Sequence, residues 1–427
     1  MDLPLMTLRQ KKRFSLFFLL SVCHPASHAS GLSLDEAVTN ARNSLPIYQA
    51  SQQKVAATEA LYTASLSPYL PTIDGSASEN QHHSSAETYN SKNYKVAVSY
   101  TVFDGGKRLA NRKIAGSNLT VDQQETRKSE IELVSTVTTA FYSAIAQRDI
   151  VKQRNLQFQF AEKDHNIAKG RHKLGYVKLS DVLQASVRLE QARFNIIEAE
   201  GDYRKALSEL NSLMGLPLQD IHDLTGSMND AISPPDESQI NEAAKNRPEI
   251  IQARTAIDIS KDTKLLAKSA FYPVVSASAA HDKNDSELYQ TSYPEEQIIG
   301  FSANWNFFEW GKYYKVVAAR HEVSAAELRL QEAQRKVLLD LSKAKDDFIT
   351  SSDMLKVADQ QIVHAEHNYN QALGEYKAGK GDILSLVQAE SLLADAKGQL
   401  ITAKLDVILS KVQWEKVAGL SASDITQ

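Results

Sequence analysis

Few residues in this chain stand in a pattern that could carry out chemistry. His82 and His83 are adjacent and could bind a metal ion or a surface, but the Ser- and Asn-rich segment around them is more typical of a solvated loop. Cys23 is the only cysteine, so neither a disulfide nor a cysteine-based metal centre is expected. The chain contains no HExxH, GxxxxGK[ST] or GxGxxG motif. We therefore predict a protein that is not an enzyme and has no metal site and no cofactor.

The composition excludes several classes of protein. The 427 residues include 48 Lys and Arg against 52 Asp and Glu, and bases alternate with acids rather than clustering. Such a chain has no field that would attract a polyanion, so nucleic acid is not an expected partner. The longest apolar run, around Phe14–Val22, is shorter than the roughly 18 residues of a membrane-spanning helix. A polytopic helical membrane protein is excluded, whereas insertion through β-strands is not.

The first 29 residues have the pattern of a secretory signal peptide. Four bases precede the apolar run, and Ser27-His28-Ala29 supplies small residues around a cleavage point, so the mature chain is expected to begin at Ser30. Cys23 partly resembles the lipidated cysteine of bacterial lipoproteins, but Val22 departs from that pattern. A lipid anchor and an ordinary signal-peptide cysteine both remain open.

The rest of the chain is an internal duplication with an offset of 202 to 205 residues. Matching anchors include Tyr69-Leu70-Pro71 with Phe271-Tyr272-Pro273, Phe103-Asp104-Gly105-Gly106-Lys107 with Phe308-Glu309-Trp310-Gly311-Lys312, and Gly175 with Gly379. We predict a first repeat over residues 30–216, a linker over 217–238, a second repeat over 239–420 and a tail over 421–427.

Each repeat predicts the same order of elements. A short helix (33–43, 239–245) and a helix after Pro46 or Pro248 precede two strands, expected at 72–81 and 92–103, then at 274–283 and 297–308. In the returning strands, apolar and aromatic residues such as Tyr94 and Val96 alternate with small or polar ones. Alternation alone is more typical of an ordinary sheet with one face on a core, but it also fits a membrane barrel wall. Four strands cannot close a barrel, so that interpretation requires an oligomer.

Very long helices follow the strands. Nothing but the tolerable Gly116 interrupts the helical pattern between Gly106 and Gly170 or between Gly311 and Gly374, which predicts helices of roughly 90 to 100 Å. The returning helices (178–214, 382–417) carry heptad seams in which larger residues alternate with alanine. The first outgoing helix carries two apolar stripes, which predicts a neighbour on each side, in a cylindrical wall or equally in a packed bundle.

The order and the duplication together resemble the TolC-like outer-membrane factor family over residues 32–420. The residues that carry the resemblance are Tyr69-Leu70-Pro71, the corner at Phe103-Asp104-Gly105-Gly106, Arg247-Pro248-Glu249-Ile250 and the paired glycine turns. The resemblance implies an internally duplicated α+β membrane protein with a long antiparallel α-helical coiled-coil barrel and a transmembrane β-barrel. Each chain supplies four strands, and a homotrimer supplies twelve.

The same resemblance implies a function and partners. The chain is expected in the cell outer membrane with a long periplasmic extension, as the passive exit duct of a tripartite efflux pump or type I secretion system. Its partners would be outer-membrane lipid, a periplasmic adaptor and an inner-membrane pump or ABC exporter. The residue patterns alone leave open a periplasmic coiled-coil adaptor or scaffold without a pore, although the duplication argues against an adaptor. The exported substrate and the particular pump are not determined.

Three groups of site residues follow from the resemblance. Adaptor-docking tips are expected at the turns between paired helices, Leu174, Gly175, Tyr176, Ala378, Gly379 and Lys380. A periplasmic entrance gate is expected from Ser180, Asp181, Tyr376, Asp382, Ser385 and Gln388, with a hydrogen bond from Tyr376 to Asp181 as its latch. Asp382 could form an acidic ring, although a helix cap is the more ordinary role. Strand-to-helix corners are expected at Gly105, Gly106 and Gly311.

Overall fold

The computed structural model describes residues 31–83, 88–231, 237–286 and 295–420. The predicted signal peptide, Cys23 and the predicted C-terminal tail lie outside these ranges. Within them, no helix combines the length and the apolar character that crossing a membrane would require.

The chain runs twice through the same order of elements, which confirms the duplicated α+β fold. The first copy contains α1 (Leu34–Ser44), α2 (Pro46–Ala64), the 3-10 turn η1 (Ser67–Tyr69), β1 (Thr72–His83), β2 (Thr88–Phe103), α3 (Lys107–Lys173) and α4 (Leu179–Met214). After the 3-10 turn η2 (Met228–Ala231), the second contains α5 (Glu237–Lys245), α6 (Pro248–Ser269), β3 (Val274–Ser286), β4 (Glu295–Asn304), α7 (Trp310–Lys377) and α8 (Ile383–Ala418).

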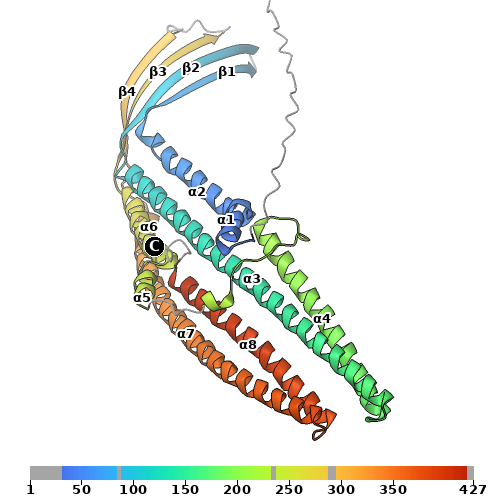
Figure 1. Ribbon diagram of the computed structural model, residues 1–427. Coiled ribbons are helices and arrows are strands. Elements are labelled where there is room, and N and C mark those ends of the chain that lie inside the picture. Colours follow the sequence, from blue (N-terminus) through green and yellow to red (C-terminus); the bar gives the residue numbers. More distant parts are fainter. Residues whose placement is uncertain (1–30, 84–87, 232–236, 287–294, 421–427) are drawn as a thin grey trace, which may run out of the picture.

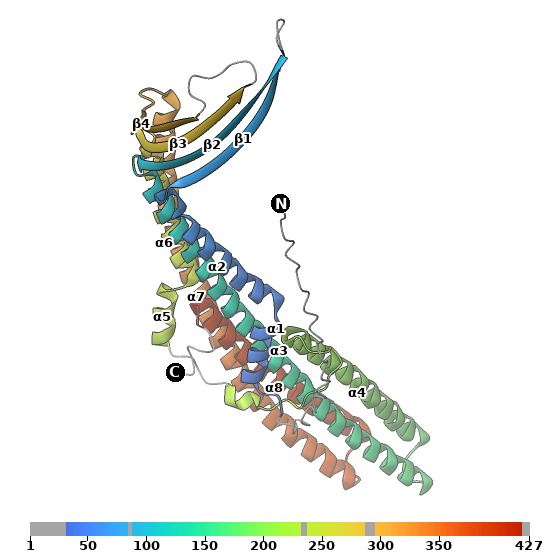
Figure 2. The same ribbon diagram turned by 90° about the horizontal axis from the view of Figure 1, so that it is seen from above.

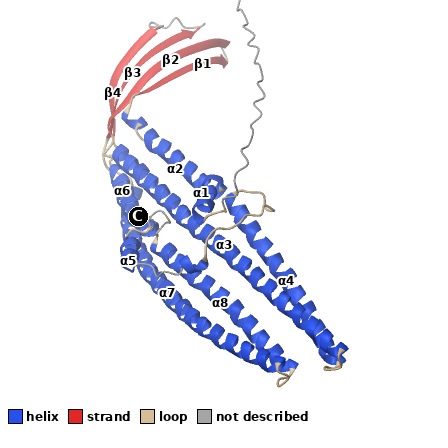
Figure 3. Ribbon diagram, in the orientation of Figure 1, coloured by secondary structure: helices blue, strands red, loops and turns tan. Residues whose placement is uncertain are grey.

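Strands and helices occupy opposite ends of an elongated molecule. The four strands form one curved sheet, and the hairpins α3/α4 and α7/α8 both point away from it, with their tips at the far end (Figures 1 and 2). Coloured by secondary structure, the strands share no layer with the long helices (Figure 3). With 67 and 68 residues, α3 and α7 each extend about 100 Å.

Local sequence signals set the ends of the shorter helices. Ser33 caps α1 in a reciprocal capping box with Glu36. Proline occupies the first turn of α2 and of α6, where its missing N–H has no helical partner to lose. Gly215 and Gly419 end α4 and α8 with positive φ angles of 68° and 84°, the left-handed conformation that glycine adopts without a steric penalty.

The sheet has the order β1-β2-β3-β4 with every neighbouring pair antiparallel. β1 continues past the predicted end to His83, which pairs with Thr88, so the expected loop around His82 and His83 is wrong. β4 was expected to reach residue 308 but ends at Asn304, opposite Val274. Pro273 precedes Val274 and has no N–H to continue the ladder, so residues 305–308 leave the sheet.

Neither face of the sheet covers a core. Every residue of β1 is exposed, and the apolar residues of β2 are open to the surroundings, with Val96 54% and Tyr94 51% accessible. On β4, Ile299 and Phe301 are 82% and 81% accessible. An ordinary sheet would bury one face, so the core-covering interpretation that the alternation favours by itself is wrong for this chain.

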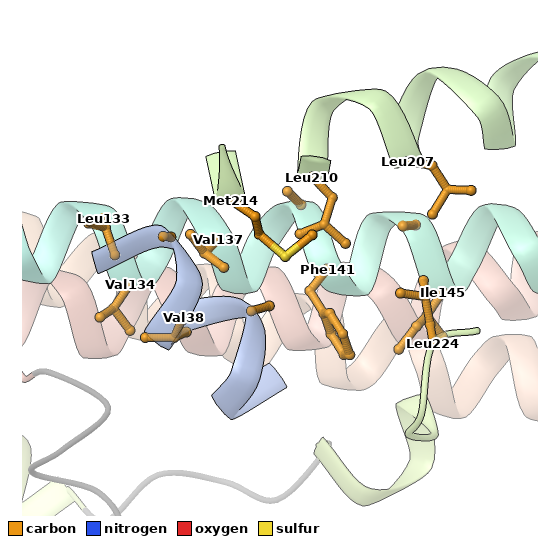
Figure 4. Packing of buried hydrophobic residues seen from close by; sticks show 14 of the residues in the cluster. Val38, Leu133, Val134, Val137, Phe141, Ile145, Leu207, Leu210, Met214 and Leu224 are labelled. Carbon is orange, nitrogen blue, oxygen red and sulfur yellow. The ribbon is translucent and has the colours of Figure 1, made fainter. Parts of the chain in front are cut away.

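The largest core lies among the helices at mid-length, where α1 and α4 pack on α3. Phe141 and Ile145 on α3 are almost fully buried between Val38 of α1 and Leu210 of α4 (Figure 4). The two apolar stripes predicted for this helix are buried except at Thr138 and Val151, which are half-buried, because α1, α4 and α8 all pack against this part of α3. The prediction of two neighbours is confirmed.

A second core joins α5, α7 and α8 around Phe348 and Trp414, whose ring centroids lie 5.6 Å apart. The heptad seam predicted for α8 is buried at Leu386, Leu393 and Val407. The matching seam of α4 is buried at Ala185 and Ala199 but only half-buried at Leu189 and Ile196. α8 packs against both α7 and α3, whereas α4 packs mainly against α3, which explains the difference.

Candidate functional site

The first strand-to-helix corner depends on Gly105 and Gly106. Both have positive φ angles, 66° and 89°, and they turn the chain from β2 into α3. A Cβ atom on Gly105 would lie 2.7 Å from the Ser269 carbonyl oxygen, whereas one on Gly106 would meet no atom within 4 Å. Asp104 closes the corner by accepting hydrogen bonds from the Gly106 and Arg108 backbone N–H groups. Gly105 is therefore required for close approach as well as for its conformation.

The second corner is built differently from the prediction. Gly311 is the second residue of α7 and has no positive φ, because Glu309 caps this helix in an extended conformation. The buried Lys312 ammonium donates to the Asn306 carbonyl oxygen at 2.8 Å and holds the turn. Duplicated sequence anchors therefore mark both corners, but only the first uses left-handed glycines.

The predicted tip residues lie at the two hairpin turns. Gly175 and Gly379 have φ angles of 78° and 73°, and the N–H groups of Tyr176 and Lys380 return to the carbonyls of Arg171 and Glu375. This is the Schellman arrangement, which satisfies the free carbonyls at a helix end. The other predicted tip side chains are exposed: Leu174, Tyr176, Ala378 and Lys380.

The predicted entrance residues cluster within the adjoining helical turns. Ser180 and Asp181 are the second and third residues of α4, and the Ser180 hydroxyl donates to Asp181 at 3.2 Å. Tyr376 contacts the first hairpin through Arg171, whose guanidinium lies 4.8 Å from the ring centroid. Among the hydrogen bonds of the described residues, none joins Tyr376 to Asp181. Tyr376 thus links the two hairpins of the chain by a cation–π contact.

Asp382 caps α8. Its carboxylate accepts a hydrogen bond from the Ser385 backbone N–H at 2.7 Å, which is the ordinary role considered from the sequence. Hydrogen bonds from Ser385 lower the pKa of this carboxyl, so it is ionised at neutral pH. Ser385 and Gln388 are exposed one turn apart on the same helix.

Substitutions at Asp382 separate its helix-capping role from a role in cation attraction. Asparagine also caps helices well, so Asp382→Asn should leave amide hydrogen exchange in the first turn of α8 unchanged, whereas Asp382→Ala should accelerate it severalfold. If the carboxylates of several copies ring the entrance, both variants should lower the cation-over-anion permeability ratio in planar bilayers. A ratio unchanged in Asp382→Asn would reject the acidic ring and leave the cap.

One polar cluster joining the two hairpins was missed by sequence reasoning. Arg188 of α4 forms an ion pair with Glu390 of α8, 202 residues away, and both side chains are largely buried. Gln153 of α3 adds a hydrogen bond to the Ala394 carbonyl oxygen at 3.3 Å. Pairing at such separation leaves no local sequence signal.

Burial governs the protonation of this cluster. It raises the pKa of Glu390 and of Asp164 above ordinary carboxyl values, and the charge of Arg188 opposes both shifts. The Asp164 Oδ2 atom is buried and accepts no hydrogen bond in the described structure. Burial also raises the pKa of the neighbouring Tyr369 hydroxyl. The cluster therefore contains two carboxyl groups whose pKa values are raised by burial, and the Arg188 guanidinium is the cation that favours their ionised forms.

Other candidates for chemistry have structural roles. His82 stacks on Tyr89 with centroids 4.7 Å apart, and the two histidines bond to Ser91 and Thr88 across the strand pair. Within the described part of the chain, no three His, Cys, Asp or Glu residues are placed to hold a metal ion. A groove of about 1030 Å³ between α3, α7 and α8 has Asp353, Asp395 and Asp406 among its polar residues.

Comparison with known proteins assigns a family. The sequence model of the outer membrane efflux protein family matches residues 37–216 and 239–420. Protein CyaE of Bordetella pertussis is 24% identical over 377 residues, which cover 86% of this chain and 80% of CyaE. Outer membrane protein TolC of Escherichia coli is 20% identical over 431 residues, covering 96% of this chain and 86% of TolC.

Solved structures agree on the fold. The outer membrane protein VceC of Vibrio cholerae superposes with a TM-score of 0.78 at 15% identity, over 91% of this chain and 96% of VceC. The open state of the Neisseria gonorrhoeae MtrE outer membrane channel superposes with a TM-score of 0.80 at 17% identity, over 92% of this chain and 90% of MtrE. With both of its halves matched, this outer-membrane chain belongs to the outer membrane efflux protein family.

Proposed function

We propose that the chain is the passive exit duct of a tripartite efflux pump or type I secretion system. The sheet carries this proposal: its strands are 10 to 16 residues long, and both of its faces lack a core in the single chain. An isolated soluble sheet of this kind would expose apolar side chains such as Phe301 to water. A membrane on the apolar face and a wet lumen on the other satisfy both faces.

The duct requires more than one copy. β1 and β4 are edge strands whose outer ladder groups are unpaired in the protomer, and open edges are not tolerated in lipid. Three copies of four strands would pair β1 of one copy with β4 of the next and close a barrel of twelve. The half-buried seam of α4 supports a neighbouring copy along the helices as well.

The hairpin tips form the periplasmic end of this duct. We assign adaptor docking to the exposed turns around Gly175 and Gly379. The entrance gate is assigned to Ser180, Asp181, Tyr376, Asp382, Ser385 and Gln388, where Tyr376 already bridges the hairpins through Arg171. Export driven by an inner-membrane pump needs no catalytic group in the duct, so the chain acts without enzymatic activity. Two tandem repeats over 30–216 and 239–420 supply its matching hairpins.

Membrane fractionation tests the proposal. Cells that express the full chain are separated into inner and outer membranes on a density gradient, and the unheated protein is sized by electrophoresis. The expected result is recovery in the outer membrane as a trimer that forms ion-conducting channels in planar bilayers. A monomer released with the periplasmic fraction would instead support the coiled-coil scaffold.

A further inference from the structure

The groove of about 1030 Å³ follows α8 where this helix lies between α3 and α7 (Figure 1). We call it the α8 groove. Its floor contains Ala394, Gly398 and Thr402, which follow one another at a spacing of one helical turn and therefore share a face of α8. Because these side chains are small, the space between the two neighbouring helices stays open. The volume is at the large end of the range for small-molecule sites.

Apolar side chains line the walls of the α8 groove. On α7, Ile349, Met354 and Val357 are 46%, 57% and 63% accessible, and Ile150 contributes from α3. The chain itself does not bury these side chains. A concave site with such walls favours a ligand that has an apolar body.

The charges of the α8 groove favour a cation. Its charged lining residues are three acids and one base: Asp353, Asp395, Asp406 and Arg154. Asp353 is paired with Lys356 at 2.8 Å, and Arg154 donates to the Gln157 side chain at 3.0 Å. Asp395 and Asp406 are exposed, and neither forms an ion pair or a side-chain hydrogen bond with any residue that the structure describes. Two carboxylates therefore remain available for a ligand.

The two free carboxylates lie at opposite ends of the floor. Asp406 follows Asp395 by 11 residues on α8, which is three helical turns, so both lie on one face of the helix. Their separation along the helix axis is roughly 16 Å. Gly398 and Thr402 lie between them. A ligand that pairs with both carboxylates must carry two cations at about this distance, joined by an apolar chain.

A buried acceptor distinguishes the Asp395 end. Gln153 of α3 is only 7% accessible, and its Nε2 atom donates to the carbonyl oxygen of Ala394 at 3.3 Å. Its Oε1 atom is buried and accepts no hydrogen bond from the residues that the structure describes. Buried polar atoms are normally paired, so this acceptor favours a ligand with an N–H donor. A primary ammonium group supplies that donor, whereas a quaternary ammonium group does not.

We propose that the α8 groove lies on the lumen side of the duct and binds elongated diamines with an apolar middle, one ammonium group at Asp395 and the other at Asp406. Among the described residues that line the groove, none belongs to α1, α5 or η2, although all three elements pack on the long helices elsewhere. A passage requires a face that such elements leave open. The inference rests on the proposed duct and names a class of cargo that would bind during passage.

Protein is the competing occupant of the α8 groove, either a neighbouring copy of the chain or a helix of another protein. An apolar protein surface would cover the walls but would also bury two carboxylates without a cation. Burying an unpaired charge is costly. The diamine satisfies both the apolar walls and the two charges.

Isothermal titration calorimetry tests the site with the full chain in phosphatidylcholine nanodiscs. Three diamines are compared. Extended dodecamethylenediamine matches the spacing of the carboxylates, putrescine is too short to reach both, and spermine is as long but carries charged amines in its middle. We expect dodecamethylenediamine to bind at one site per chain and severalfold more tightly than the other two. Equally tight binding of spermine would show unspecific attraction of charge and would overturn the proposal.

Substitutions of single carboxylates locate the binding. Asp395→Asn and Asp406→Asn should each weaken the binding of dodecamethylenediamine by about tenfold, because each removes one charge-assisted hydrogen bond. Both residues are exposed, so the fold should not change. Asp359→Asn is the matched control, since it removes an equally exposed carboxylate of α7 that does not line the groove. Equal affinities in the control and in the two groove variants would overturn the site.

The remaining outcomes separate the groove from the duct. A chain that forms channels in planar bilayers but binds no dodecamethylenediamine would overturn the groove and leave the duct intact. A chain that binds the diamine but forms no channel would overturn the duct, and with it the role of the groove in export. Absent binding, together with a Thr402→Cys side chain that a water-soluble maleimide cannot label in a Cys23→Ser background, would show that protein covers the groove and would also overturn the proposal.

Discussion

Replacing Arg188 with methionine is expected to weaken the packing between the two hairpins by about 2 to 4 kcal/mol at neutral pH. Removing one partner of a buried ion pair leaves the other charge uncompensated, which costs roughly 3 to 5 kcal/mol in a dry site. The estimate is lowered because the Arg188 and Glu390 side chains keep 21% and 14% of their accessibility. Asp164 would lose the same nearby cation.

Amide hydrogen exchange of residues 183–195 and 383–400 measures this loss in the detergent-solubilised protein. Arg193→Met is the matched control on the same helix, because Arg193 pairs with Glu190 at 3.6 Å with both side chains 63% accessible. Such an exposed pair contributes about 0 to 1 kcal/mol. Equal protection in the two variants would show that the Arg188–Glu390 contact does not hold the hairpins together.

The destabilisation of hairpin packing by Arg188→Met should become smaller as the pH falls. Burial raises the pKa of Asp164 and of Glu390, so the packed hairpins bind these protons more tightly than separated hairpins do. Packing therefore gains stability as the pH falls from neutral through the raised pKa values, and the gain stops below ordinary carboxyl values, where both states are protonated. In Arg188→Met the cation that opposes these pKa shifts is absent. Mild acidification should therefore increase the stability of hairpin packing more in Arg188→Met than in the wild type.

Phe141→Ala should destabilise the mid-length core by about 3 to 5 kcal/mol. Phe141 is 1% accessible and lies among Val38, Leu210 and Ile145, so truncation leaves a cavity that rigid helices cannot readily fill (Figure 4). The 11-residue α1 is too short to persist without this packing, and its exchange protection should fall most.

The control for Phe141 is an identical truncation elsewhere. Phe194 on α4 is 62% accessible in the single chain, so Phe194→Ala should leave hydrogen exchange in α1 unchanged. If Phe141→Ala also left α1 as protected as in the wild type, the core would not be what anchors that helix.

Much of the architecture could be predicted because its signals are local and repeated. Proline positions bound the short helices, glycines end the long ones, and the two stripes of α3 indicate its neighbours. The predicted ends of the strands were less accurate, since a strand stops where its partner strand stops. β4 ends at Asn304 because Pro273 limits β3, and His83 stays in β1 because Thr88 is opposite.

The candidate site divides in the same way. The capping role of Asp382 could be predicted from its place before α8. The positions of Gly175 and Gly379 at the hairpin turns could be predicted from their place between two helical segments. The partner of Tyr376 could not, because Arg171 reaches it from the other hairpin through tertiary packing. Nothing near Arg188 in the sequence identifies Glu390, and neither residue's burial is a local property.

The sequence by itself determined the duplication, the order of elements, the long helices and the family resemblance, because each depends on spacing along one chain. Only the tertiary structure decided that the sheet lacks a core and that a largely buried ion pair joins the two hairpins. Those features depend on which surfaces meet, and a chain that leaves both faces of its sheet open relies on other molecules to cover them.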